Sequence, residues 1–284
     1  MINTIYNPMK KEMVIFGNGW LGNKYKDYYK EKAQIVSADI SDPKAVEKVL
    51  DRLRPKIVIN AAGKTGRPNG DWCEEHKLET LNSNITGPLM LLKSCVDRNI
   101  FLVQLSSGCL FNGKKRGGFT EEDQPKPPNF YAWTKATADN ILKKFPVLIL
   151  RLRMPIDDLP GPRNLITKLT KYPKIIDVEN SVTVVKDLIR ATDQLIKKRE
   201  TGIYNVTNPD AVKHRDILKW YKELVNPHHQ YQMIPLKDLS RLGLAKTGRS
   251  NCILNTKKLA AAGIKLPNSK LAIIRCLKNY KKYL

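Results

Sequence analysis

Along the first half of the chain, short apolar runs alternate with stretches whose apolar residues recur at helical spacing. The apolar runs occupy residues 12–17, 33–38, 56–63, 101–106 and 147–152. Helical patterns occupy residues 20–32, 44–53 and 76–98, and a further one begins at Tyr131. Strands that alternate with helices are typical of right-handed βαβ units. The pattern therefore predicts an α/β fold with a doubly wound parallel sheet.

The alternation loosens in the second half of the chain. Residues 156–175 and 207–284 are rich in Pro, Asn and Lys and contain only short helical patterns, while one last helix and strand of the sheet lie before residue 207. We therefore expect a main domain of residues 1–155 plus 176–206. A smaller C-terminal lobe should contain residues 156–175 plus 207–284.

The composition favours an intracellular protein that is long enough to form a large core. The 284 residues are 42% hydrophobic, which is enough for a large core. No segment approaches ~20 uninterrupted apolar residues, and the first residues do not resemble a signal peptide. The five cysteines form no CxxC pair and the four histidines are scattered, so free thiols and no metal site are expected. The prediction is a cytoplasmic protein without membrane contact.

A formal charge of +23 raises the question of a nucleic-acid partner. The lysines are spread along the chain, however, and no RNA-binding or helix-turn-helix signature accompanies them. We therefore expect no specific nucleic-acid partner. The charge indicates a solvated basic surface that suits phosphorylated metabolites.

The segment 17-GNGWLG-22 follows the first strand and fits GxGxxG with Gly17, Gly19 and Gly22. Glycine permits a tight turn and close approach of the backbone to a pyrophosphate, and the N-terminus of the next helix attracts the anion. The motif therefore predicts a Rossmann-type dinucleotide site that includes Trp20 and Leu21.

The second expected strand ends near Asp39 and Ile40, which bear on the choice of dinucleotide. Asp39 lies near the spacing at which an acidic residue binds the ribose hydroxyl of NAD. The Asp-Ile pair can instead flank the adenine, and the surrounding lysines suit the 2′-phosphate of NADPH. NADPH is the favoured cofactor, with NADH as the alternative.

Two further pairs of residues point to chemistry at the open edge of the sheet. Tyr131 and Lys135 lie four apart at the start of a helix, and so share one face. A neighbouring ammonium is expected to lower the pKa of the phenol. Ser107 and Cys109 lie two apart where the fourth strand ends, so their side chains should point to the same side.

The order of GxGxxG, 60-NAAG-63, Ser107 and Tyr131-x-x-x-Lys135 resembles the extended short-chain dehydrogenase/reductase family. The resemblance implies that the smaller lobe holds a nucleotide sugar. It implies that Ser107 binds the reacting oxygen, Tyr131 transfers the proton and Lys135 holds the nicotinamide ribose. The cofactor residues that it adds on the third strand are Asn60, Ala61, Ala62 and Gly63.

Longer strings carry a narrower likeness. The segments 63-GKTGRPNGDWCEEHK-77, 106-SSGCLF-111, 162-PRNLITKLTKY-172 and 249-RSNCILNT-256 resemble the bifunctional 3,5-epimerase/4-reductases of UDP-rhamnose synthesis, a likeness that runs from Val14 to near the C-terminus. It implies metal-independent conversion of UDP-4-keto-6-deoxyglucose to UDP-L-rhamnose. A single glycine-rich fingerprint implies that a separate 4,6-dehydratase supplies the keto sugar.

In these epimerase-reductases a cysteine two residues after the catalytic serine handles protons beside the ketone, which here is Cys109. The resemblance makes Lys168 its partner. Without the resemblance, Cys109 would be read as an inert thiol, and Lys168 has the alternative of a solvated surface lysine. The residues expected to bind the nucleotide sugar or organise its site are Thr65, Arg67, Asn84, Arg163, Asn164, Arg249 and Asn251.

Other readings stay open. One is a reductase-only enzyme like dTDP-4-dehydrorhamnose reductase or GDP-fucose synthase. Another is a non-catalytic Rossmann protein that senses a dinucleotide or binds RNA. The residues do not decide between UDP and dTDP, nor between a monomer and a homodimer.

Overall fold

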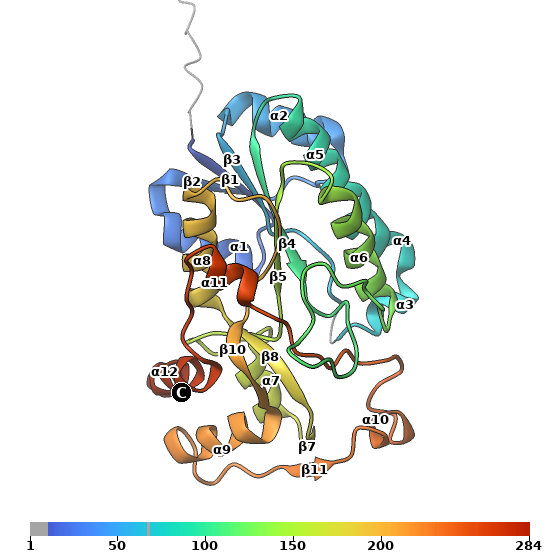
Figure 1. Cartoon of the computed structure of the whole chain (residues 1–284), viewed down its shortest axis with the longest axis vertical. Helices are drawn as coiled ribbons and strands as arrows, with labels where there is room; N and C mark the ends of the chain where they lie inside the picture. The colour runs from blue at the N-terminus through green and yellow to red at the C-terminus, as the bar shows by residue number, and fades with distance from the viewer. Residues whose placement is uncertain (1–10, 67–68) are drawn as a thin grey trace, which may run out of the picture.

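The structure is a computed structural model that describes residues 11–66 and 69–284. Its centre is the expected parallel sheet, which has six strands in the order β2-β1-β3-β4-β5-β9 (Figure 1). The strands are β1 (Met13–Phe16), β2 (Ala33–Val36), β3 (Ile57–Asn60), β4 (Phe101–Ser107), β5 (Leu148–Leu152) and β9 (Gly202–Asn205). The order reverses between β1 and β3, which is where doubly wound sheets bind ligands.

Helices cover both faces of this sheet (Figure 1). One face carries α1 (Trp20–Tyr29), α8 (Val185–Lys197) and α11 (Lys257–Ala261). The other carries α2 (Pro43–Leu53), α5 (Gly87–Val96) and α6 (Phe130–Leu142). Successive strand residues point to opposite faces, so Ile15 and Ile59 join the first apolar cluster while Val14 and Val58 join the second. Burial on both faces explains why the strands are apolar throughout.

The helix expected over residues 76–98 is present without a gap from Lys77 to Val96, with a π-helical turn within it. The structure has α3 (Trp72–Glu75), α4 (Lys77–Leu81) and α5, with a π-helical turn over Asn82–Thr86 before α5. Helical spacing of apolar residues does not reveal the extra residue of a π turn, and such turns are frequent at functional sites.

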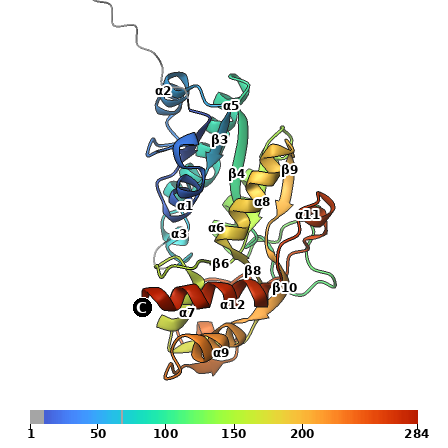
Figure 2. The same cartoon turned by 90° about the vertical axis from the view of Figure 1, so that its left-hand side faces the viewer.

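The smaller lobe is built from short elements below the main sheet (Figure 1). Its strands are β6 (Pro155–Ile156), β8 (Glu179–Val184) and β10 (Asn208–Lys213) in one sheet, and β7 (Lys174–Ile176) and β11 (Gln232–Ile234) in another. Its helices are α7 (Leu165–Lys171), α9 (His214–Leu224), α10 (Asp238–Arg241) and α12 (Ser269–Tyr280). Figure 2 shows α12 crossing the lobe, where it contacts β8, β10 and α9. In the described part of the chain, no helix has the length and apolarity to cross a membrane.

At two places, residues pack on the other side of an expected domain boundary. β8 pairs with β6 and β10 in the lobe, although residues 176–206 were assigned to the main domain. Conversely, Leu259 and Ile264 lie in the apolar cluster under the main sheet, although residues 207–284 were assigned to the lobe. The division into two domains stays a prediction. The chain passes between the main sheet and the smaller lobe more often than the sequence pattern indicates.

His214, at the start of α9, gives the lobe a pH dependence. Burial first, and the charge of Arg153 second, lower the pKa of His214 from 6.5 to about 4. The unfolded state therefore binds a proton at a higher pH than the folded state does, so stability is full above pH ~6.5 and falls as the pH drops toward ~4.

Through His214, the unfolding free energy of the wild type should fall by about 3 kcal/mol between pH 7 and pH 4. In His214→Asn this part of the fall should be absent. Urea unfolding at a series of pH values measures this. His228→Asn, in an exposed loop, is the matched control. Equal pH slopes for wild type and His214→Asn would contradict the assignment.

Candidate functional site

The turn after β1 lies beside the end of β3, where Phe16 pairs with Asn60. Gly17 has a φ of +102°, and a Cβ there would lie 2.4 Å from the backbone nitrogen of Ala62. A Cβ on Gly22 would lie 2.0 Å from the carbonyl oxygen of Gly17. The protein's own packing therefore requires glycine at both positions.

Gly19 differs from these two, because a Cβ there would meet no atom within 4 Å. It is the N-cap of α1, and no side chain caps the helix at this end. Trp20 and Leu21 form the first turn. Open space over an uncapped helix N-terminus fits the pyrophosphate of a dinucleotide.

We expect Gly19→Ala to fold normally, since Gly19 has extended backbone angles, and to weaken dinucleotide binding by about 10-fold or more, because the methyl group enters the space over the helix terminus. Fluorescence titration with NADPH measures this. Gly22→Ala is the contrasting variant, which should lose stability by its clash with Gly17. Unchanged NADPH affinity in Gly19→Ala would contradict the placement of the pyrophosphate.

The remaining predicted cofactor residues lie around this turn. Asn60 donates to Gln104 Oε1 at 2.8 Å and accepts from the Ala62 nitrogen at 3.1 Å, which fixes the backbone of Ala61–Gly63. Asp39 is exposed, and hydrogen bonds from the Ser41 backbone and hydroxyl lower its pKa. Ile40 is buried in the core. Direct contacts of these residues with a cofactor stay predictions.

Asn84 lies in the π-helical turn and joins two parts of the site. Its Oδ1 accepts from the Lys64 nitrogen at 2.9 Å, and its Nδ2 donates to the Lys64 oxygen at 2.9 Å and to Thr134 Oγ1 at 3.2 Å. Thr134 lies on α6 between Tyr131 and Lys135. Asn84 therefore ties the loop after β3 to the helix that carries the expected proton donor.

Tyr131 lies in the first turn of α6 beside Ser107, at the end of β4. Burial raises the pKa of Tyr131, and a hydrogen bond with the Ser107 hydroxyl partly opposes this. The expectation that Lys135 lowers the pKa of Tyr131 is not met in the structure. Lys135 is buried and donates to the Leu105 oxygen at 3.0 Å, and burial lowers its own pKa. The phenol is therefore held protonated, as a proton donor must be.

Cys109 is half-buried just beyond β4, whereas the other four cysteines are buried. Its nitrogen donates to Ser107 Oγ at 3.0 Å, so the serine fixes the turn that carries the sulfur. Charge on Cys109 acts on both Tyr131 and Lys168. The pKa of the half-buried Lys168 is lowered by burial first and by Arg163 second. The thiol is thus close enough to both the phenol and the amine for its charge to affect them.

Arg163 connects the lobe to the loop after β3. Its Nη1 donates to Thr65 Oγ1 at 2.8 Å and to the Gly66 oxygen at 3.0 Å. Arg67 lies outside the described residues. Asn164 is fully buried as the N-cap of α7, where its side chain bonds the Ile166 nitrogen and the backbone of residues 157 and 159. Asn164 therefore shapes the backbone before α7, and a contact with substrate stays a prediction.

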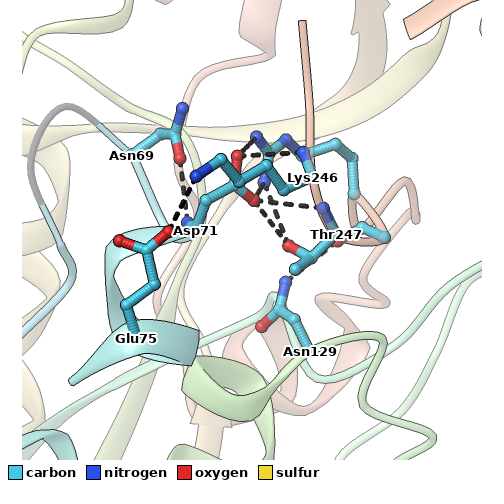
Figure 3. A network of polar contacts seen from close by, with 8 residues as sticks. Asn69, Asp71, Glu75, Asn129, Lys246 and Thr247 are labelled. Atoms are coloured by element: carbon cyan, nitrogen blue, oxygen red, sulfur yellow. Dashed lines mark hydrogen bonds and ion pairs between the residues drawn. The ribbon is translucent and has the colours of Figure 1, made fainter. Parts of the chain in front are cut away.

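Arg249 is engaged by Asp71, from the loop before α3. Its two terminal nitrogens donate to the carboxylate at 2.8 and 2.7 Å, and the Thr247 hydroxyl donates to the same carboxylate at 2.7 Å. Figure 3 shows Asp71 at the centre of this network, with Lys246 also bonded to Glu75 at 2.7 Å. The hydrogen bonds from Arg249 are the main cause of a lowered Asp71 pKa. We call the Asp71–Arg249 contact the clasp.

Asn251 lies two residues further along, half-buried. Its Oδ1 accepts from Asn180 Nδ2 at 3.2 Å and its Nδ2 donates to the Arg249 oxygen at 3.3 Å. The segment 249–251 is therefore held against β8 at the edge of the space that Cys109 borders.

Several residues of the site were missed from sequence. Asp71, Arg153, Asn180 and Ser250 carry no motif of their own. The signal for Asp71 was its place in the specific 66-GRPNGDWCE-74 string. Across residues 11–66 and 69–284, no three His, Cys, Asp or Glu side chains gather as metal ligands would.

The chain is similar to several known proteins. The family model described as RmlD substrate binding domain matches residues 11–282. A bifunctional dTDP-4-dehydrorhamnose 3,5-epimerase/dTDP-4-dehydrorhamnose reductase of Arabidopsis thaliana is 38% identical over 248 residues, which are 84% of this chain and 82% of that protein.

A trifunctional UDP-glucose 4,6-dehydratase/UDP-4-keto-6-deoxy-D-glucose 3,5-epimerase/UDP-4-keto-L-rhamnose-reductase of the same plant is 33% identical over 96% of this chain, which spans 42% of that protein. Among solved structures, a UDP-rhamnose synthase of Acanthamoeba polyphaga mimivirus superposes with a TM-score of 0.89 at 30% identity, covering 95% of this chain and 99% of that one.

Proposed function

Since the chain belongs to the RmlD substrate binding domain family, we propose that it is a bifunctional 3,5-epimerase/4-reductase that converts UDP-4-keto-6-deoxy-D-glucose to UDP-L-rhamnose with NADPH. Its reductase activity is the property shared across the similar proteins, whose names include reductases of dTDP- and UDP-linked sugars. The observation that supports the epimerase half is the half-buried Cys109 beside Ser107, whose charge affects both Tyr131 and Lys168.

The reduction takes place at C4 of the sugar. Bound NADPH supplies the hydride, and the open N-terminus of α1 with the turn Gly17–Gly22 holds its pyrophosphate. Ser107 donates a hydrogen bond to the C4 oxygen, and Tyr131 gives that oxygen its proton. A raised pKa keeps the Tyr131 phenol protonated at neutral pH, as this role requires. Lys135 holds the nicotinamide ribose from its buried position.

Inversion at C3 and C5 precedes reduction. The C4 ketone acidifies both neighbouring C–H bonds, so a base removes the proton and the electron pair moves into an enolate. An acid on the opposite face of the ring then returns a proton. Cys109 and Lys168 share these two tasks. The lowered pKa of Lys168 increases the fraction of neutral amine that can act as a base.

The nucleotide diphosphate lies in the lobe. Arg249 and Asn251 approach it from the C-terminal segment, and Arg163 approaches it from the residues just before α7. The guanidinium groups of the two arginines suit bidentate pairing with phosphate. Thr65 approaches from the loop after β3, and Arg67, which lies outside the described residues, is a further proposed contact by its place in the sequence. The keto sugar comes from a 4,6-dehydratase, an activity that the trifunctional relatives carry in the same chain. We place the enzyme in the cytoplasm, where such a supply of nucleotide sugars lies.

The test is to incubate the protein in D₂O with UDP- or dTDP-4-keto-6-deoxyglucose and with NADPH or NADH. NMR of the product should show L-rhamnose labelled with deuterium at C3 and C5, formed fastest from the UDP sugar with NADPH. A reduced sugar without deuterium at these carbons would indicate a reductase-only enzyme. Absence of any reduction would overturn the proposal.

A further inference from the structure

Arg153 follows β5 and is the bulkiest of the fully buried side chains in the described structure. Its Nη1 donates to Cys109 Sγ and to the Gly108 oxygen, both at 3.4 Å, and to Ser250 Oγ at 3.0 Å. Its Nη2 donates to Asn180 Oδ1 at 2.5 Å and to the Ser250 oxygen at 2.7 Å. The guanidinium thus contacts the sulfur of Cys109 and the backbone of the C-terminal segment at the same time.

The charge of Arg153 has no carboxylate partner. Among the residues that the structure describes, no Asp or Glu oxygen comes within ion-pair distance of it, and its oxygen acceptors are amides, carbonyls and a hydroxyl. Arg151, two residues earlier and also buried, pairs with Asp139 at 2.9 Å. Buried charges are ordinarily paired, because an unpaired one loses its hydration without compensation. The partner of Arg153 that can become an anion is the sulfur of Cys109.

We propose that Arg153 is a positioning residue for the epimerisation, which holds the Cys109 sulfur toward the sugar and stabilises its thiolate form. The role of Arg153 in epimerisation rests on the proposed function. In the step that it supports, a C–H bond of the sugar breaks, an S–H bond forms, and the electron pair moves to the ketone oxygen as an enolate. The buried guanidinium supplies the counter-charge before the proton is taken up.

Other groups also face the sulfur. Tyr131 approaches from α6, Lys168 from α7 and Cys252 from the C-terminal segment. Of these only Lys168 can be cationic. Lys168 is linked to the sulfur only through its charge, whereas Arg153 contacts the sulfur directly.

The same guanidinium reaches the segment that is proposed to bind the nucleotide. Ser250 stands between Arg249 and Asn251, and its hydroxyl and carbonyl both accept from Arg153. Asn180 accepts from Arg153 and donates to Asn251. Arg153 therefore sets the position of the thiol relative to the diphosphate subsite.

The experiment measures alkylation of Cys109 by iodoacetamide across pH, with mass spectrometry to identify the modified peptide. The full-length protein is used without substrate, and the four buried cysteines give a low background. Arg153→Met should slow alkylation at neutral pH by about 10-fold or more, because the thiolate then loses a hydrogen bond from a charged group. Its profile should move to higher pH, and Arg153→Lys should restore part of the rate.

A second variant keeps the guanidinium in place. Asn180→Asp puts a carboxylate where Asn180 Oδ1 now accepts from Arg153, so the arginine gains another counter-ion and alkylation should slow as well. Thermal unfolding and NADPH titration identify any variant that fails to fold. If folded Arg153→Met and Asn180→Asp both keep the wild-type alkylation profile, the inference is overturned.

The inference and the proposed function fail separately. Slower alkylation in the variants, in a protein whose wild type does not exchange deuterium at C3 and C5, supports the thiolate contact and removes its role in epimerisation. Exchange in the wild type that is unchanged in Arg153→Met leaves the epimerase in place and overturns the role of Arg153.

Discussion

Replacing Tyr131 by phenylalanine is expected to lower the rate of C4 reduction by about 10²–10⁴-fold, the usual contribution of a positioned general acid. Burial raises the pKa of this phenol, so at neutral pH it carries the proton that the C4 oxygen needs. Its neighbour Ser107 can hydrogen-bond the same oxygen, but phenylalanine has nothing to donate. Loss of NADPH absorbance with a sugar already in the rhamno configuration measures the reduction alone.

The same variant should still exchange deuterium at C3 and C5, because Cys109 and Lys168 are unchanged. Tyr28→Phe, on an exposed part of α1, is the matched control and should reduce the sugar at the wild-type rate. A reduction rate in Tyr131→Phe within a few-fold of wild type would remove Tyr131 from the proton-transfer role.

Replacing Cys109 by alanine should have the reciprocal effect. Exchange of deuterium into C3 and C5 should fall by about 10²–10⁴-fold, because the thiol is one of the two groups that can move a proton at these carbons. Reduction of a sugar supplied in the rhamno configuration should persist, since Ser107 and Tyr131 remain. NMR of the labelled keto sugar follows the exchange without NADPH.

Cys109→Ser separates acidity from shape in this experiment. A hydroxyl is nearly the size of the thiol but is far less acidic, so the serine variant should be as poor in exchange as the alanine variant. Normal exchange in either variant would show that Cys109 is not the proton carrier, and the reductase-only reading would then hold.

The fold was predicted from sequence because both of its signals are local. The apolar runs of β1, β3, β4 and β5 are continuous, as burial on both faces requires, and the turn Gly17–Gly22 marks the start of the first helix. The π-helical turn Asn82–Thr86 between α4 and α5 was missed because the helix continues on both sides of it. The crossing of β8 into the lobe was missed because strand pairing depends on residues distant in sequence.

For the candidate site, too, some residues were predicted from sequence and others were missed. Motifs indicated Ser107 and Tyr131, and the family resemblance added Cys109 and Lys168. In the structure Ser107 bonds the Cys109 nitrogen, and charge on Cys109 affects Tyr131 and Lys168. The expected effect of Lys135 on the Tyr131 phenol was wrong, because spacing along a helix does not show burial, which here dominates. Arg153 had no local signal, since its meaning comes from partners in three separate segments.

The clasp between Asp71 and Arg249 bears on which anions the protein can accept. If Arg249 receives the diphosphate as proposed, the ligand must first displace a carboxylate that already uses both ends of the guanidinium. A small free anion offers Arg249 no more hydrogen bonds than the Asp71 carboxylate already does. A nucleotide sugar offers its base, ribose and hexose contacts in addition, so occupancy by cellular inorganic phosphate should be suppressed. The Asp71 carboxylate would thereby make the protein select nucleotide sugars over small anions.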